Sequence, residues 1–354
     1  MQPIHVALDP PDAEYWPLDK LLTLQERNLC AGTLERAGRS SLFADRLPRS
    51  LKLCGRDELR ALPFTTADHL RTVLRGRGLR RLAAAPPYLW LCSASAADRK
   101  WAPQAPEDLQ RTMGILARVI RMLGLAPSEV LLVISQPAPL FQNSLPYLLM
   151  YADRWDTGLH LELVVGTMAM AEHNNWPEFA VRRQASTLIA RPSDALALSA
   201  RFARAGGEGL TLPRQAFQRL RRGLFYGENL EPHRARLQGE FGLEAFACYA
   251  SVEYPYYACE CAAHSGLHVW LDVSIPEIIP DQEAARASSD RRYQPMSFFL
   301  DQAPAGLEGE LVVTTFAHSL PMIRYRTGDR VRVVSTEPCA CTCTHPRIEV
   351  LGRL

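Results

Sequence analysis

The chain has 354 residues, of which 47% are hydrophobic and 22% charged, so we expect a folded protein with a buried core. Its 40 basic and 38 acidic residues give a net charge of +2, which provides no long-range attraction to nucleic acid or to an acidic membrane. The first sixteen residues lack the basic stretch and apolar run of a signal peptide, and the apolar stretches are too short to span a bilayer. We therefore expect a cytoplasmic protein that has no nucleic-acid partner and no membrane partner.

Apolar spacing predicts helices across residues 16–60, followed by a helix that Thr66 caps and that ends near Leu74. Strands and helices are then expected to alternate, at residues 89–92, 107–123, 130–135, 161–165, 176–187, 188–190 and 193–205. This order is typical of a parallel sheet that is covered by helices.

After residue 245 the pattern changes to strands and turns with almost no helical periodicity. Residues 310–316 and 330–335 are predicted to be antiparallel strands, and the polar residues 281–292 a mobile loop. The expected fold class is α/β, with two helix-covered lobes and a β-rich subdomain. We divide the chain into an N-terminal helical segment at 1–60, the α/β lobes at 61–250 and the β-rich subdomain at 251–354.

A series of short motifs runs from residue 62 to the end of the chain. They are LPFTT (62–66), YASVE (249–253), GLHVW (266–270), GELVVTT (309–315), PMIRYRTGD (321–329), CAC (339–341), THPRI (344–348) and GR (352–353). In this order and spacing they resemble the large N-terminal domain of phenylacetate–CoA ligases, which are adenylate-forming, AMP-binding enzymes. The small C-terminal lid domain that carries a catalytic lysine in that family is expected to be absent.

The resemblance implies an ATP or AMP site. It places Asp329 on the ribose hydroxyls, Tyr249 on adenine and Arg353 near ribose or phosphate, while Gly227 and Glu228 match another nucleotide-binding segment. Glu253 would be the catalytic residue and would hold Mg²⁺ against the phosphates. Plainer interpretations of the same residues stay open. Asp329 could be a turn aspartate that caps its own backbone, and Tyr249 a core tyrosine. Arg353 could be merely a C-terminal arginine, and Glu253 an exposed loop glutamate.

The family binds ATP phosphates with a glycine-rich loop, and the matching segment here is residues 93–100. Ser93, Ser95 and Lys100 are the predicted phosphate contacts. Both glycines of the family loop are absent, and Asp98 stands where phosphate oxygens would pass. Val252 also replaces a hydroxyl residue of the family motif. These departures from the family pattern predict weaker binding of the triphosphate.

Four residues form a candidate structural zinc site: Cys261, His268, Cys339 and Cys341. Three thiolates and one imidazole are an ordinary tetrahedral zinc set, and some members of the resembled family carry cysteines at these places. Other candidates for the fourth ligand are Cys259, His264, Cys343 and His345. A group of buried, unligated cysteines is the alternative.

The sequence thus predicts an ATP-dependent enzyme that activates a small carboxylic acid as an acyl- or aryl-adenylate. The substrate pocket is expected around residues 141–147 and Tyr226. CoA, a carrier protein or a separate partner would accept the acyl group, and a homodimer stays open. The alternative is a catalytically degenerate relative that acts as an acid- or nucleotide-binding partner protein.

Overall fold

The computed structural model describes residues 12–47, 55–76, 81–92, 100–125, 129–135, 161–171, 175–205, 213–254, 257–290 and 292–354. Ser93 and Ser95 of the predicted phosphate loop, and the predicted pocket residues 141–147, lie outside these ranges.

The described strands are β1 (Leu89–Cys92), β2 (Trp101–Gln104), β3 (Val130–Ser135), β4 (Glu162–Thr167), β5 (Thr187–Ala190), β6 (Arg222–Tyr226), β7 (Glu244–Tyr249), β8 (Ala258–Glu260), β9 (Leu267–Val269), β10 (Ser274–Pro280), β11 (Phe298–Phe299), β12 (Glu308–Thr315), β13 (Tyr325–Ser335) and β14 (Arg347–Arg353). The described α-helices are α1 (Leu18–Asn28), α2 (Leu34–Arg39), α3 (Ala67–Arg75), α4 (Pro106–Met122), α6 (Met168–Ala171), α7 (Trp176–Arg182), α8 (Pro192–Ala205), α9 (Pro213–Ala216), α10 (Glu231–Phe241) and α11 (Asp281–Ser289).

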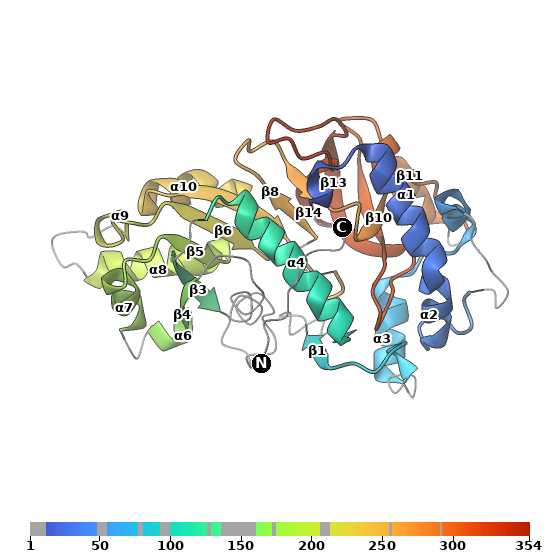
Figure 1. The fold of residues 1–354 in the computed structure, drawn as a ribbon, viewed down its shortest axis with the longest axis horizontal. Coiled ribbons are helices and arrows are strands. Elements are labelled where there is room, and N and C mark those ends of the chain that lie inside the picture. Colours follow the sequence, from blue (N-terminus) through green and yellow to red (C-terminus); the bar gives the residue numbers. More distant parts are fainter. Residues whose placement is uncertain are drawn as a thin grey trace.

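The described residues form one main sheet of twelve strands, in the order β11-β10-β12-β13-β14-β9-β8-β7-β6-β5-β3-β4 (Figure 1). Strands β3 to β7 pair in parallel, which confirms the sheet expected from the alternating strands and helices. From the pairing of β7 with β8 onwards all partners are antiparallel. The chain is thus an α/β protein with a β-rich part, as predicted. The pairing of β7 with β8 crosses the expected boundary at residue 250, and the domain boundaries stay predictions.

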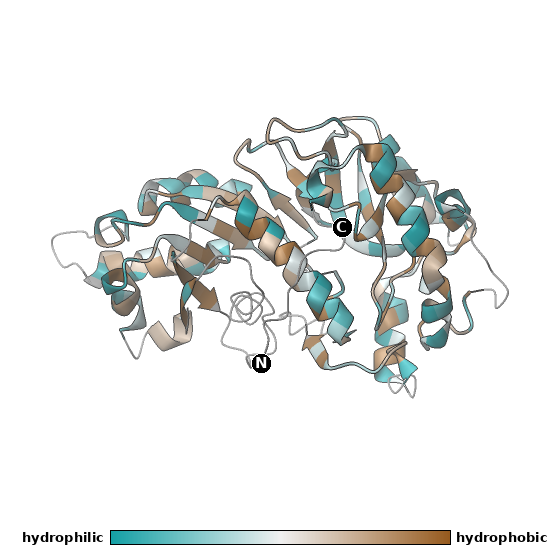
Figure 2. Cartoon of the chain, in the orientation of Figure 1, coloured by the Kyte–Doolittle hydropathy of each residue, from teal (hydrophilic) through white to brown (hydrophobic). Residues whose placement is uncertain are grey.

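Helix α4 lies across the junction between the two parts of the sheet (Figure 1). Its apolar face packs in a core with strand residues of the parallel part and with Trp270. Its N-terminus is tied to the loop after β12, because the Asp108 carboxylate accepts hydrogen bonds from the backbone N–H groups of His318 (2.6 Å) and Ser319 (2.9 Å). In Figure 2, α4 carries both hydrophilic and hydrophobic residues, as expected of a helix with one face on a core.

A buried arginine joins α4 to two distant segments. Arg118 has no exposed surface, and its guanidinium donates to Glu14 (3.0 Å) and, through two nitrogens, to Asp272 (3.0 and 2.9 Å). Burying a guanidinium is costly unless carboxylates pair with it. This pairing therefore fixes residue 14 and the turn after β9 against α4.

Two sequence predictions were wrong. Residues 281–292 are not a loop, because α11 occupies Asp281–Ser289. All side chains of α11 are at least partly exposed, so the sequence has no apolar stripe that would indicate a helix there. The acidic residues Asp281 and Glu283 lie in its first turn, where negative charge stabilises a helix. The helix predicted for 176–187 ends at Arg182, because Gln184 takes a positive φ of 59°. Thr66, by contrast, caps α3 as predicted.

None of the helices in the described ranges is both long enough and apolar enough to cross a membrane.

The close packing of β12 on β10 can be tested at Gly309. A Cβ added at Gly309 would lie 2.0 Å from the Ile279 carbonyl oxygen, which is backbone and cannot move aside. We expect Gly309→Ala to lower the free energy of unfolding by about 2 kcal/mol or more. Gly239 in α10 has no atom within 4 Å of an added Cβ, so Gly239→Ala should be neutral or should stabilise by up to about 1 kcal/mol. Urea denaturation of both variants measures this, and equal stabilities would contradict the packing.

Candidate functional site

The carboxyl ends of three neighbouring parallel strands lie at one edge of the sheet. Gly227 and Glu228 follow β6, Tyr249 ends β7, and Ser193 lies just after β5. Glu228 accepts hydrogen bonds from the hydroxyl (2.6 Å) and the backbone N–H (3.0 Å) of Ser193, and Gly227 has a φ of +77° that favours glycine. Ligands of open parallel sheets bind at such an edge. Gly227, Glu228 and Tyr249, the predicted nucleotide-binding residues at the ends of β6 and β7, therefore lie at this edge of the sheet.

The structure brings together Tyr249, Asp329 and Arg353. Asp329 on β13 faces Arg353 on β14, whose Nη1 donates to Asp329 Oδ1 at 2.8 Å. The Tyr249 hydroxyl donates to Asp329 Oδ2, and it also lies 3.1 Å from the Tyr254 hydroxyl. A carboxylate has about four acceptor positions, of which these donors use two. Asp329 is therefore held in place and keeps the capacity to accept two further hydroxyl groups.

Glu253 belongs to a second network. Its side chain is 1% exposed, and its Oε1 lies 3.0 Å from the Tyr325 hydroxyl, which donates to it, and 3.1 Å from Lys100 Nζ. Lys100 also donates to the Tyr325 hydroxyl at 3.2 Å, while Ser251 donates to Oε2 of Glu253. Lys100, the last residue of the predicted phosphate loop, is thus paired with the predicted magnesium ligand.

Tyrosines connect the two networks. The Tyr254 ring lies 6.0 Å from the ring of Tyr249 and 6.4 Å from that of Tyr325, measured between centroids. Burial raises the pKa values of Tyr249, Tyr254 and Tyr325, so their hydroxyls stay protonated and can donate. Sequence reasoning missed Tyr254 and Tyr325, although Tyr325 lies within the PMIRYRTGD motif.

The arrangement does not fit a magnesium ion at Glu253. Mg²⁺ needs an octahedral set of oxygen ligands, usually one or two carboxylates with waters and phosphates. Both Glu253 oxygens already accept hydrogen bonds, and the Lys100 ammonium compensates the charge. Within the described ranges, the one group of three or more potential metal-ligand residues does not include Glu253. The magnesium role is an implication of the resemblance alone.

That group consists of Cys261, His268, Cys339 and Cys341, whose ligand atoms all lie within 4.8 Å of one another. The Cys261 and Cys339 sulfurs are 3.8 Å apart, and Cys341 Sγ is 3.4 Å from His268 Nε2. Two sulfurs at about 2.3 Å from one tetrahedral zinc ion would be about 3.8 Å apart. The other predicted candidates for the fourth ligand, Cys259, His264, Cys343 and His345, are not in the group.

The surroundings of the group suit metal ligation. Burial lowers the pKa of His268 to about 4, so the imidazole is neutral at pH 7, the form that binds a metal. Its Nδ1 lies 3.3 Å from the His345 carbonyl oxygen, which leaves Nε2 facing the sulfurs. Burial, as the largest effect, raises the pKa of Cys261 to about 12, so without a bound cation its thiol keeps the proton.

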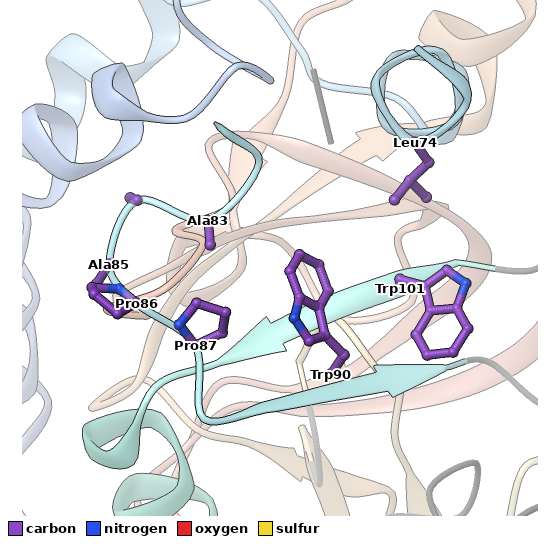
Figure 3. A pocket seen from close by; sticks show the side chains of 8 residues that line it. Leu74, Ala83, Ala85, Pro86, Pro87, Trp90 and Trp101 are labelled. Carbon is purple, nitrogen blue, oxygen red and sulfur yellow. The ribbon is translucent and has the colours of Figure 1, made fainter. Parts of the chain in front are cut away.

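The cavities among the described residues include a small one and a large one. One of about 50 Å³ is lined by Glu253 and Tyr254 together with Asp108 and Arg111 of α4. The other, of about 840 Å³, is apolar and open to solvent, and Figure 3 shows Trp90 and Trp101 on its β1–β2 hairpin. Among the predicted site residues that the structure describes, none lines the larger cavity.

The sequence matches no family model and no curated protein. Solved structures do resemble the chain. An open conformation of 2-hydroxyisobutyryl-CoA ligase in complex with 2-HIB-AMP and CoA superimposes with a TM-score of 0.72 at 17% identity, over 97% of this chain and 73% of that one. The Vibrio cholerae adenylation domain AlmE in complex with glycyl-adenosine-5'-phosphate gives a TM-score of 0.50 at 16% identity, over 75% and 47%.

The chain therefore has the fold of the large domain of adenylate-forming enzymes, as the motif order predicted.

The tyrosine network predicts how stability depends on pH. An unfolded tyrosine ionises near pH 10, whereas burial raises the pKa values of Tyr325 and Tyr249 in the folded chain. The unfolded state then binds fewer protons, so the free energy of unfolding falls above pH 10 by about 1.4 kcal/mol per pH unit for each such tyrosine. Tyr325→Phe should remove that slope contribution, and Tyr88→Phe, at a position 75% exposed, should not. Denaturation from pH 9 to 11.5 measures both, and identical slopes would contradict the assignment.

Proposed function

We propose that the chain activates a carboxylic acid as an acyl- or aryl-adenylate, in the manner of a phenylacetate–CoA ligase. The observation that carries the proposal is the meeting of Tyr249, Asp329 and Arg353 beside the carboxyl end of β7. It is supported by the fold, since the neighbouring 2-hydroxyisobutyryl-CoA ligase was solved with 2-HIB-AMP and AlmE with glycyl-adenosine-5'-phosphate.

Asp329 would bind the ribose. Its carboxylate is oriented by the Arg353 guanidinium and the Tyr249 hydroxyl, and its remaining acceptor positions suit the two ribose hydroxyls. Donors and acceptors that are fixed before the ligand binds reduce the entropy lost on binding. Tyr249 would lie against the adenosine, and Gly227 and Glu228, at the end of β6, would flank it.

In the proposed reaction the carboxylate oxygen of the acid attacks the α-phosphorus of ATP. The bond from that phosphorus to the bridging oxygen breaks, and pyrophosphate leaves with the electron pair. An acceptor thiol then loses its proton to solvent and attacks the acyl carbon as the thiolate, and AMP leaves with the electron pair of the broken bond between the acyl carbon and the phosphate oxygen. The chain's residues would act mainly by positioning and charge neutralisation. CoA, a carrier protein or a separate partner would supply the thiol, and the 2-hydroxyisobutyryl-CoA ligase complex contains CoA.

A second candidate is a relative that binds an adenylate or an acid without turning over ATP. The observation in its favour is the buried pairing of Glu253 with Lys100, together with the absence of glycine from residues 93–99. Both candidates use the adenosine contacts, and they differ in whether the triphosphate reacts.

We also propose that Cys261, His268, Cys339 and Cys341 hold one structural zinc ion. It would join the β8–β9 hairpin to the turn between β13 and β14, and so support both strands that carry Asp329 and Arg353. The four donors would close its tetrahedral coordination, which leaves no position for a substrate.

Carboxylate-dependent exchange of pyrophosphate into ATP, measured with a panel of aryl and fatty acids, tests the activity. We expect exchange with at least one acid, and Asp329→Asn should lower it at least tenfold because the amide cannot accept both ribose hydroxyls as the carboxylate does. Gln302→Glu, at an exposed position in the short turn that follows β11, is a surface control that should leave exchange unchanged. The absence of exchange with every acid would favour the binding-protein candidate.

Calorimetry tests the nucleotide preference that follows from the altered loop. AMP and a non-hydrolysable acyl-AMP analogue should bind at least as tightly as ATP, since the adenosine contacts remain while the loop lacks glycines. ATP binding at least tenfold tighter than AMP, about 1.4 kcal/mol, would contradict this preference.

Elemental analysis tests the zinc proposal. Purified protein should contain one zinc per chain, and Cys341→Ser should lose it and melt several degrees lower, because metal binding contributes to folding. Cys30→Ser, at an exposed cysteine outside the group, should keep the zinc and the melting temperature. Wild-type protein without stoichiometric zinc would overturn the proposal.

A further inference from the structure

Lys100 and Glu253 form an ion pair that is almost completely removed from solvent. The Lys100 side chain is 9% exposed and that of Glu253 is 1% exposed, with 3.1 Å between Nζ and Oε1. The Tyr325 hydroxyl accepts from Lys100 and donates to Glu253, so the three groups form a closed ring of contacts. A buried pair of this kind is retained only when geometry and hydrogen bonds offset the desolvation of both charges.

The pair lies where a phosphate-binding cation would be expected. Glu253 follows the carboxyl end of β7, and Tyr254, the next residue, contacts the Tyr249 hydroxyl of the Asp329 network. A divalent cation at Glu253 would have to enter beside a positively charged ammonium and displace the donors on both carboxylate oxygens. Coulomb repulsion at such short distances in a buried site opposes this strongly.

We propose that the Lys100 ammonium is the resident cation of Glu253, and that this chain therefore binds a nucleotide's phosphates without a divalent metal ion. The inference rests on the proposed nucleotide site and adds that no divalent cation at Glu253 takes part in holding its phosphates. A lysine ammonium offers three N–H donors and serves as a point charge for phosphate. The same lysine, by pairing with Glu253, keeps that carboxylate from repelling the phosphates.

The first test uses the wild-type full chain and needs no variant. ATP is titrated calorimetrically in metal-scrubbed buffer with and without added Mg²⁺, on protein that keeps its zinc. The dissociation constants in the two conditions should agree within twofold. ATP binding at least tenfold tighter with Mg²⁺ would overturn the inference.

The second test asks whether Lys100 keeps a metal out. Mn²⁺ binding, followed by electron paramagnetic resonance without nucleotide, should be absent in the wild type and stoichiometric in Lys100→Met, where Glu253 loses its ammonium partner. The double variant Lys100→Met with Glu253→Gln should bind no Mn²⁺, and Lys20→Met, at an exposed lysine of α1, should behave as the wild type. Mn²⁺ bound stoichiometrically by the wild type, or by neither wild type nor a folded Lys100→Met, would overturn the inference.

The failure of this inference is distinguishable from failure of the proposed function. If an acyl-AMP analogue binds but ATP binds in neither condition, Lys100 does not serve phosphate, and the adenylate site stands. If neither ligand binds, the nucleotide site and the inference both fail. A Lys100→Met chain that does not fold leaves the wild-type comparison of ATP with and without Mg²⁺ to decide.

Discussion

The candidate site depends on the hydrogen bond from the Tyr249 hydroxyl to the Asp329 carboxylate. Tyr249 ends the last parallel strand, and Asp329 lies in the antiparallel part of the same sheet. The bond therefore joins the two parts of the fold at the point where strand direction changes. Arg353 donates to the other carboxylate oxygen. Asp329 is thus held by two residues, Tyr249 and Arg353, that lie 104 positions apart in the sequence (353 − 249).

The scaffold around this bond relies on buried charge pairs. Arg118 pairs with Glu14 and Asp272 under α4, and Lys100 pairs with Glu253 near the site. Such pairs are weak evidence for high stability, because desolvation offsets much of their attraction, but removing one partner leaves a buried charge without compensation. Their effect is to fix α4, the N-terminal segment and the loop after β7 in one arrangement around the sheet.

Much of the fold and part of the candidate site could be predicted from the sequence. The alternation of strands and helices predicted the parallel strands, since each apolar run and each helical face carries its own local signal. The motif order predicted the neighbours Asp329 and Arg353, and the positions of Cys261, His268, Cys339 and Cys341 were predicted together. Local patterns could not reveal the pairing of Lys100 with Glu253, because it depends on a contact across 153 positions (253 − 100). Helix α11 was missed because its polar side chains leave no apolar period.

The most direct test of the account is a crystal structure of the chain with a non-hydrolysable acyl-adenosine analogue. The ribose hydroxyls should lie within hydrogen-bond distance of the Asp329 carboxylate, with Tyr249 and Arg353 still bound to it. An analogue bound elsewhere, or a ribose that makes no contact with Asp329, would contradict the central claim that this carboxylate forms the adenosine site.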